Sequence, residues 1–408
     1  MEKEIVIVSV TAGGGHKSAM HSLGESLKRY APDVRVVYFE STVEDIEKAH
    51  RVIYSKFTRL YDRFYDLMEQ DAVRGAYFCF TRSIIEQLKA ELRPFFERAQ
   101  TGLIVSTHFM QTYALLQLKA SLQADTHIAA YVPDFNESLI HVPRYRGLLP
   151  NSVIAQSPAY LAKLQEKYGL LASQTLQAGY IPRSPFTAAR SLSQMEARVA
   201  FQRQNLPMVS NVLPECFTVV ATGGTYWVEH LYKQFKVLAT DDEFDWHNSQ
   251  VLVVCGNNAR AYKKFSDLAE RSGKRIIPLP FLNAEQMSLA FRSASVTVLS
   301  GIAPATLYEL LETDAGPILI HRINPGPEKF NLAVATSRHL ADYCPDPAAL
   351  LQRLIQLSQQ PQAADAAKQA FCQHARVERE AALLRAKAVA LSLAQMLQQS
   401  SVLHASAF

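Results

Sequence analysis

Three glycines followed by a histidine stand near the start of the chain, in the stretch EIVIVSVTAGGGHKSA that begins at Glu4. The apolar run before them is typical of a buried parallel strand, and the residues after them follow a helical pattern. Glycines at such a turn let a ligand approach the backbone, and a helix start offers unpaired N–H groups and the positive end of a dipole. We therefore expect Gly14 and Gly15 to border a site for an anion. The spacing matches neither G-x-G-x-x-G nor a P-loop, which argues against a nicotinamide or ATP site.

His16 follows these glycines at the first turn of the predicted helix. The positive end of the dipole lowers the pKa of an imidazole there and favours the neutral form, which can accept a proton. His16 is therefore predicted to act as a general base or to contact the substrate. The alternative is a histidine that only caps the helix.

The second half of the chain has a similar turn in ATGGTYW (221–227), again between a strand and a helix. Gly223, Gly224 and Thr225 are predicted to form a second backbone cradle for an anion. A tight strand-to-helix turn without a ligand is the alternative.

The stretch SGIAPATLYELLE begins at residue 300 and predicts a strand end, a run of small residues and a helix start. Pro304 opens this helix and Thr306 lies in its first turn, so a phosphate or ribose could lie against it. Glu309 lies about a turn further on, and a carboxylate suits a ribose diol because it only accepts hydrogen bonds. A glutamate exposed on the helix surface is an equally weighted alternative.

The turn NPGPEKFN (324–331) leads into another predicted helix. It offers Glu328 and Asn331, which could hold sugar hydroxyls. The Pro-Gly pair also fits a surface turn with no function.

Strand-length apolar runs alternate with helical patterns in both halves of the chain, separated by the proline-containing stretch IPRSPF (181–186). This alternation predicts an α/β fold with two doubly wound, Rossmann-like domains that face a common cleft. A long helix is predicted from about 363 to 398. The predicted strands lie at 4–10, 34–40, 102–108, 127–134, 152–157 and 176–180, and then at 216–224, 250–256, 275–281, 296–301 and 317–322.

Composition limits the classes of protein to consider. The 408 residues are 48% hydrophobic, and the net charge of +4 is too small to predict nucleic-acid binding. Five scattered cysteines without CxxC spacing indicate a reducing, cytoplasmic compartment. No apolar run approaches the roughly 20 residues of a membrane span, so we expect membrane contact, if any, from one side.

The segment 45–100 is long for a crossover and rich in aromatic and basic residues. Tyr61 and Phe64 share a predicted helix face with Tyr54, Phe57 and Tyr65. Such a face could lie on anionic lipid and admit a lipid acceptor, or bind another hydrophobic small molecule. Packing of this face against the sheet is weighted about equally.

These motifs, in this order, resemble an inverting glycosyltransferase group. The group contains the monogalactosyldiacylglycerol synthases, the processive diacylglycerol glucosyltransferases and, more distantly, the peptidoglycan N-acetylglucosaminyltransferase. Further marks of the resemblance are LIVSTHFMQ (103–111), VPDF (132–135), QAGYIPRSPF (177–186), VVCGNNARAYKKF (253–265) and PFLNAEQMSLAFRSAS (280–295). The resemblance implies a GT-B fold with an acceptor domain at 1–185, a nucleotide-sugar domain at 186–362 and a helix at 363–408 that returns to the first domain.

The resemblance also implies roles for residues that match the family's motifs. Acceptor binding falls to Gly14, Gly15 and His108, with Tyr61 and Phe64 of the aromatic face as further acceptor contacts suggested by their spacing. Catalysis falls to His16, with Asp134 as second candidate for the base or for a group that orients it. Donor binding falls to Gly223, Gly224, Thr225, Phe281, Pro304, Ala305, Thr306, Glu309, Glu328 and Asn331, with Phe281 at the base, which is usually uracil.

The sequence departs from the family at several of these positions. Ala303 and Ala305 replace usual glycines, and Pro327 replaces a glutamine, so a contact from a side-chain amide to the sugar is lost. Thr225 replaces a third glycine in the second cradle, and the usual threonine before Asp134 is missing. These changes leave the identity of the sugar open.

The expected reaction is inverting transfer of a hexose from a UDP-sugar to a hydroxyl of a diacylglycerol-like lipid. No cofactor or metal is predicted, because Asp241 and Asp242 lie in a polar loop apart from the motifs. Transfer to a non-lipid acceptor is one alternative. A nucleotide-sugar 2-epimerase and a non-catalytic nucleotide-sugar-binding protein are alternatives from other classes.

Overall fold

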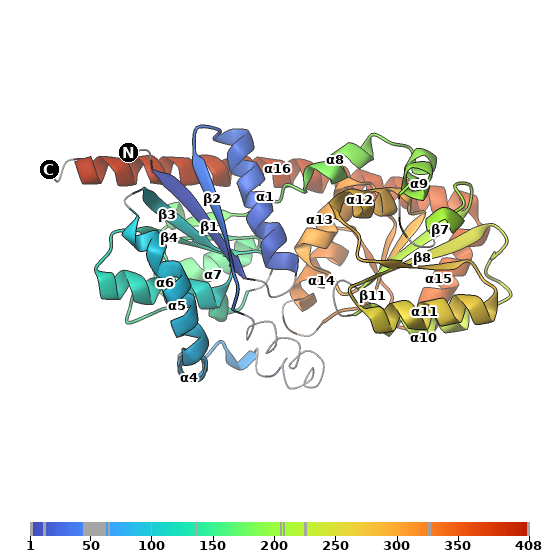
Figure 1. Cartoon of the computed structure of the whole chain (residues 1–408), viewed down its shortest axis with the longest axis horizontal. Helices are drawn as coiled ribbons and strands as arrows, with labels where there is room; N and C mark the ends of the chain where they lie inside the picture. The colour runs from blue at the N-terminus through green and yellow to red at the C-terminus, as the bar shows by residue number, and fades with distance from the viewer. Residues whose placement is uncertain are drawn as a thin grey trace. The chain divides into compact units, whose positions relative to one another are not determined.

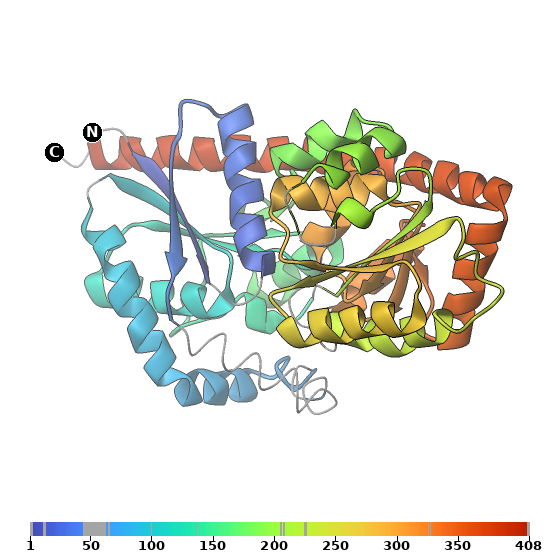
Figure 2. The ribbon, with the colours of Figure 1, turned by 45° about the vertical axis from the view of Figure 1, so that its right-hand side comes forward.

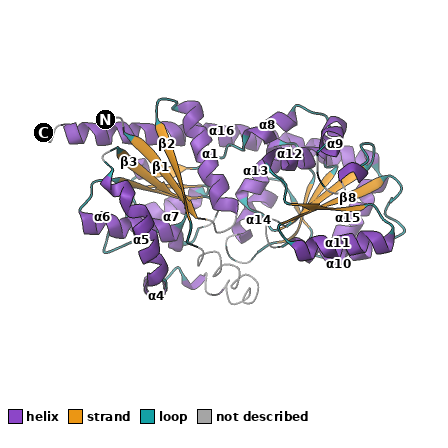
Figure 3. Ribbon diagram, viewed as in Figure 1, coloured by secondary structure: helices purple, strands orange, loops and turns teal. Residues whose placement is uncertain are grey.

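The computed structural model describes residues 3–10, 14–43, 63, 66–98, 100–135, 137–204, 206, 209–223, 227–324, 326 and 328–405. The chain divides into two compact units (Figure 1). Unit 1 comprises Met1–Ile181, Pro325–Phe330 and Ala381–Phe408, and unit 2 comprises Pro182–Asn324 and Asn331–Glu380. Each unit is a parallel sheet covered by helices on both faces (Figure 3).

The sheet of unit 1 has six parallel strands in the order β2-β1-β3-β4-β5-β6. The strands are β1 (Glu4–Val10), β2 (Arg35–Ser41), β3 (Thr101–Ser106), β4 (His127–Val132), β5 (Ser152–Ala155) and β6 (Thr175–Gln177). The helices of this unit are α1 (Gly14–Tyr30), α4 (Asp71–Phe80), α5 (Arg82–Glu97), α6 (Phe109–Leu122) and α7 (Pro158–Tyr168), with short 3-10 turns η1 (Leu139–His141) and η2 (Ala172–Gln174).

Strand β1 shows why these runs are apolar throughout. Ile5 and Ile7 pack into a core formed with α1 and the end of the last helix, α16 (Pro361–Ala405). Val6 and Val8 point the other way, into a core formed with α5 and α6. Successive side chains of a strand alternate between faces, so the middle of a strand that is buried on both faces is apolar at consecutive positions, as at residues 5–8.

The last helix begins in unit 2 and ends in unit 1, because its residues fall on both sides of the division at Glu380. In unit 1 it packs closely against Gly179, where an added Cβ would lie 2.0 Å from the Ala382 carbonyl oxygen. Only glycine fits this contact without displacing the helix. The predicted crossing helix is therefore present, and it is longer than the predicted 363–398.

The sheet of unit 2 has six parallel strands in the order β12-β11-β10-β7-β8-β9. The strands are β7 (Phe217–Thr222), β8 (Ser249–Gly256), β9 (Ile276–Pro280), β10 (Val296–Ser300), β11 (Ile318–Arg322) and the two-residue β12 (Asp342–Tyr343). The helices are α8 (Ser184–Arg190), α9 (Gln194–Gln202), α10 (Tyr232–Leu238), α11 (Ala259–Ser272), α12 (Ala284–Ser293), α13 (Pro304–Glu312), α14 (Glu328–Ser337) and α15 (Pro347–Gln359), with 3-10 turns η3 (Val209–Asn211) and η4 (Val228–Leu231).

Helices α10, α11 and α15 share one core with β7 and β8, while α12 and α13 lie on the opposite face of the sheet (Figure 2). The predicted fold class is confirmed, since both halves are doubly wound parallel α/β layers. Strand β12 was not predicted, because it pairs with β11 at only two positions and is too short to give a hydrophobic pattern. None of the described helices has both the length and the apolar character that crossing a bilayer requires.

Candidate functional site

The first turn of α1 lies at the carboxyl edge of the sheet of unit 1, directly after β1. An added Cβ at Gly14 or Gly15 would meet no atom within 4 Å, so space is open beside the backbone of this turn. Helix starts of this kind bind anions through their N–H groups. Gly13, the first of the three glycines, lies outside the described residues.

His16 is held in one tautomer by a residue 91 positions away in the sequence. Its Nδ1 lies 2.7 Å from the Thr107 carbonyl oxygen, which can only accept, so Nδ1 carries the proton and donates it. Thr107 is fixed in turn, because its N–H donates to the Val8 carbonyl over 3.0 Å. The remaining nitrogen of His16, Nε2, therefore bears the lone pair, as a general base requires.

The pKa of His16 is lowered from its ordinary value, chiefly because burial disfavours the charged imidazolium. The carboxylate of Asp134 and the bond to Thr107 act against this by stabilising the charged form. At neutral pH the imidazole is therefore uncharged and able to accept a proton, and Asp134 lies close enough to stabilise the resulting cation.

His108 caps the start of α6, where its Nδ1 accepts a bond from the Met110 N–H over 3.3 Å. Its ring meets that of His16 edge-on, with 4.9 Å between the ring centroids, and stacks on Phe109 with centroids 4.5 Å apart. The structure thus brings His16, His108 and Asp134 together at the ends of β1, β3 and β4, which are neighbours in the sheet.

His141 belongs to the same cluster and was missed by the sequence analysis. Its ring lies 5.7 Å from that of Phe109, and burial together with the nearby His16 lowers the pKa of His141 to about 3. A second neutral imidazole therefore lines the surroundings of His16. His141 could have been considered from the sequence, because the stretch VPDFNESLIH (132–141) runs on from the end of β4 at the same edge of the sheet.

In unit 2, the turn after β7 explains the glycine at position 223. A Cβ there would lie 2.1 Å from the Val228 backbone nitrogen, so close packing inside the turn excludes any other residue. The element that follows is the 3-10 turn η4 leading into α10, and not a helix directly after the strand as predicted. Gly224 and Thr225 lie outside the described residues, so the predicted cradle stays a prediction.

The start of α13 follows β10 at the carboxyl edge of the second sheet. Pro304 is its first residue, and the capping position is Ala303, whose side chain cannot accept a bond from the first turn. Ala305 is buried and Thr306 half-buried beside it. A helix start without a side-chain cap has N–H groups to offer to an anion.

Glu309, the predicted ribose ligand, forms an ion pair with Arg183. The Arg183 Nη2 and Nε atoms lie 2.7 and 3.1 Å from Glu309 Oε1, and neither bond uses Oε2. The Glu309 side chain is only 8% exposed and that of Arg183 is 38% exposed. Burial raises the pKa of Glu309, while Arg183 opposes the rise.

The amide of Asn331 makes a hydrogen bond within the protein. The side chain is fully buried, and its Nδ2 donates to the Ile302 carbonyl over 2.9 Å. This bond ties Asn331 to the loop before α13, and its contact with a sugar stays a prediction. Glu328 begins α14 and is half-buried, and its neighbour Lys329 is paired with Asp66 at 2.9 Å within unit 1.

Phe281 follows β9 at the carboxyl edge and its side chain is 62% exposed, as a stacking surface for a base would be. Arg322 ends β11 at this edge, and its carbonyl accepts from the Gly301 N–H over 2.8 Å. Its charge helps to lower the pKa of the nearby His230, although burial is the larger cause. Arg322 was not among the predicted site residues, although HRINPG marks a strand end as clearly as the other motifs.

Tyr61 and Phe64, the predicted acceptor contacts, lie outside the described residues, as does Pro327. Over the part of the chain that is described, no group of three or more His, Cys, Asp and Glu side chains is arranged to hold a metal ion.

No protein-family model matches the sequence, and no curated protein matches it either. Solved structures do match over nearly the whole chain. Trehalose-6-phosphate synthase from Burkholderia multivorans is 12% identical, with a TM-score of 0.59, and the match covers 99% of this chain and 100% of that one. UDP-GlcNAc 2-epimerase from Neisseria meningitidis, solved with UDP-GlcNAc, is 10% identical, with a TM-score of 0.56 and coverage of 94% and 100%. MurG from Acinetobacter baumannii is 10% identical, with a TM-score of 0.51 and coverage of 92% and 95%.

Sequence identities this low show that the fold is shared. They do not show a shared activity, which depends on the side chains of each protein. The two six-stranded parallel sheets, the long C-terminal helix and these neighbours show that the chain has the GT-B fold found in UDP-sugar glycosyltransferases.

Proposed function

We propose that this chain is an inverting hexosyltransferase that moves a hexose from a UDP-sugar to a hydroxyl group of an acceptor. The observation that carries the proposal is the geometry of His16. Its Nδ1 proton is committed to Thr107, so Nε2 presents a lone pair beside a glycine-bordered helix start. A neutral imidazole with a fixed tautomer is the group that deprotonation of an alcohol requires.

In this mechanism, Nε2 of His16 takes the proton from the acceptor hydroxyl as its oxygen attacks the anomeric carbon. The attack comes from the face opposite the leaving diphosphate and inverts the configuration. The Thr107 carbonyl and the Asp134 carboxylate stabilise the imidazolium that forms, since both favour the charged ring. Asp134 is thus assigned to support the base through its charge, with direct proton transfer to Asp134 as the second possibility.

Unit 2 is proposed to hold the nucleotide sugar at the carboxyl edge of its sheet. The first turn of α13 and the Arg322 guanidinium supply positive charge for the diphosphate. Glu309 accepts ribose hydroxyls through Oε2 while Oε1 keeps its bonds to Arg183. Phe281 offers its exposed ring to the base. The helix start and this arginine would stabilise the departing UDP without a resident metal.

The acceptor is proposed to be a diacylglycerol-like lipid, reached through peripheral contact with an anionic membrane. The resemblance to the lipid-modifying glycosyltransferases supports this choice. Two large apolar side chains are exposed on the described part of the predicted aromatic insert, with Phe80 90% and Leu67 47% exposed. A hydrophobic small-molecule acceptor would use the same surface, so the test must include both.

A 2-epimerase is the second candidate, because a UDP-GlcNAc 2-epimerase shares the fold over nearly its whole length. Such an enzyme needs no acceptor and changes the sugar of the donor itself. The two activities therefore differ in their products.

The deciding experiment incubates the purified full chain with radiolabelled UDP-hexoses, with and without diacylglycerol vesicles that contain anionic lipid. A glycolipid and an equal amount of UDP support the proposal. Label on a water-soluble acceptor supplied instead would retain the transferase and reject the lipid. An epimerised donor, or binding without turnover, would reject transfer altogether.

The His16→Ala variant tests the assignment of the base. We expect turnover to fall by roughly 10²–10⁴-fold with little change in the affinity for UDP. His21→Gln is a matched control, because His21 lies on the same helix and its ring faces Tyr38, at 5.7 Å between centroids. Turnover of His16→Ala equal to that of the control would reject the role of His16.

A further inference from the structure

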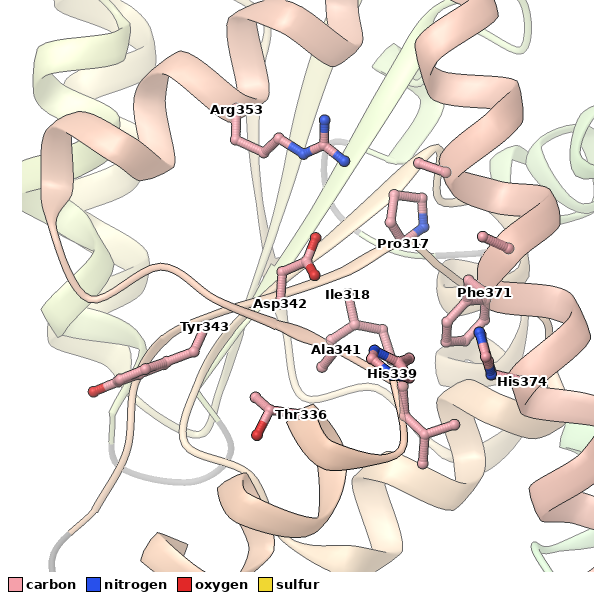
Figure 4. A pocket seen from close by; sticks show the side chains of 13 residues that line it. Pro317, Ile318, Thr336, His339, Ala341, Asp342, Tyr343, Arg353, Phe371 and His374 are labelled. Carbon is pink, nitrogen blue, oxygen red and sulfur yellow. The ribbon is translucent and has the colours of Figure 1, made fainter.

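A pocket of about 460 Å³ lies in unit 2, where β11 and β12 begin (Figure 4). It is bordered by Pro317 and Ile318 at the start of β11, by the end of α14, and by residues of α15 and α16. The residues assigned above to the donor lie at the other ends of the strands, since Arg322 closes β11. The pocket is therefore separate from the proposed nucleotide-sugar site.

Its floor is apolar and rigid. Ile318, Leu340 and Phe371 are almost completely buried there. The Phe371 ring packs so tightly against Gly316 that a Cβ at that glycine would lie 2.2 Å from it. A preformed apolar floor suits the C–H face of a ring-shaped ligand.

The walls of the pocket carry polar side chains, among them those of Arg353, Asp342, His339 and His374 (Figure 4). The Arg353 guanidinium points in from α15, and one of its N–H groups donates to Gln356 Oε1 over 2.7 Å. Asp342 points towards Arg353 from β12. His339 and His374 stand together further along, with ring centroids 5.3 Å apart.

His339 occupies a backbone position where glycine is usual. It follows the end of α14 with a φ of 54°, in the left-handed region that disfavours a side chain. A histidine is nevertheless placed there, and its imidazole lines the pocket.

We propose that this pocket binds a phosphorylated polyol, of which a hexose phosphate is the simplest example. The planar fork of Arg353 matches a phosphate group. A carboxylate such as that of Asp342 accepts hydrogen bonds and suits hydroxyl groups, and the ring nitrogens of the two imidazoles can hydrogen-bond to further hydroxyls. The apolar floor covers the carbon face of the ring.

Two simpler ligand classes leave part of the pocket unexplained. An inorganic anion alone would contact Arg353 but would gain nothing from the apolar floor. A zwitterion such as an amino acid would match Arg353 and Asp342 but leave both imidazoles without a role. A hydroxylated ligand with one anionic group would contact Arg353, Asp342, both imidazoles and the apolar floor.

The test is calorimetric titration of the intact chain with glucose 6-phosphate, glucose, inorganic phosphate and alanine. We expect saturable one-site binding of glucose 6-phosphate and binding at least roughly tenfold weaker for the other three, because each lacks part of the recognised structure. Equal binding of inorganic phosphate, or preference for alanine, would overturn the proposal, as would no binding of glucose 6-phosphate.

Variants locate the site. Arg353→Gln should weaken binding of glucose 6-phosphate by roughly tenfold or more, and Ala370→Trp should abolish it by filling the pocket. Arg376→Gln removes an exposed arginine of α16 that does not line the pocket, and it should bind as the wild type does. Loss of binding in Arg322→Gln but not in Arg353→Gln or Ala370→Trp would assign the phosphate to the carboxyl edge and refute the pocket. Thermal melting of each variant separates loss of binding from loss of the fold.

Discussion

The ion pair between Arg183 and Glu309 leads to a prediction that combines stability with pH. The Arg183→Gln variant leaves a carboxylate that is 8% exposed without the cation that now donates two bonds to its Oε1. Removing one partner of a fully buried pair costs about 3–5 kcal/mol. Because Arg183 itself is 38% exposed and screened by solvent, we expect a smaller loss of about 2 kcal/mol at neutral pH.

The loss should depend on pH in a defined direction. Burial raises the pKa of Glu309, and removal of Arg183 raises it further. A carboxyl whose pKa is higher in the folded than in the unfolded chain contributes most to stability below its unfolded pKa of about 4.3, and this contribution is lost as pH rises through the folded pKa. The deficit of the variant should therefore be small near that pH and grow towards neutral pH.

The assay uses the two tryptophans of the chain, Trp227 and Trp246, which both lie in unit 2, so intrinsic fluorescence follows the unfolding of that unit. A loss of about 2 kcal/mol should lower its melting temperature by roughly 4–8 °C at neutral pH. The Glu309→Gln substitution in the Arg183→Gln background should restore part of this, because no buried charge remains.

The neighbouring pair provides the matched control. Arg190 Nη1, at the end of α8, lies 3.0 Å from Glu312 Oε1, at the end of α13, and the Arg190 side chain is 40% exposed. Arg190→Gln should lower the melting temperature of unit 2 but leave the affinity for UDP unchanged, while Arg183→Gln should alter both. A deficit for Arg183→Gln that is the same at acid and neutral pH, or that Glu309→Gln fails to reduce, would refute the reasoning.

Further predictions concern the base, the last helix and the loop before α13. Because the pKa of His16 is lowered, turnover should persist below pH 6.5 and fall only as pH drops through the lowered value, and a fall that begins above pH 6.5 in a pH–rate profile would contradict this. Gly179→Ala should destabilise unit 1 by about 1–3 kcal/mol, because its Cβ would lie 2.0 Å from the Ala382 carbonyl oxygen; hydrogen exchange of α16 measures this, and unchanged protection would refute the close contact. Asn331→Ala should cost about 1–3 kcal/mol in unit 2, because the Ile302 carbonyl loses a buried bond, and should weaken binding of UDP. Wild-type melting and affinity in that variant would show that the loop before α13 does not depend on this amide.

Much of the architecture was predictable because its causes are local. Residues 5–8 are apolar at every position, which is typical of a strand covered on both faces, and the structure has β1 at Glu4–Val10. Pro304 begins α13, as predicted, because a proline lacks the N–H group that the first turn of a helix leaves unpaired. Gly14 and Gly15 lie at the start of α1, also as predicted. The same order of strands and helices predicts that the site residues lie at the carboxyl ends of the strands.

The alternation of strands and helices, the two doubly wound sheets and the positions of His16, His108 and Asp134 at strand ends can all be read from the order of residues. What these groups can do chemically depends on contacts made in the folded chain. The tautomer of His16 depends on a carbonyl 91 residues away, the charge on Glu309 depends on an arginine 126 residues away, and Asn331 is turned inward to Ile302. Secondary structure arises from neighbouring residues, whereas protonation and hydrogen bonding in a site depend on burial and on partners that only the folded chain brings together.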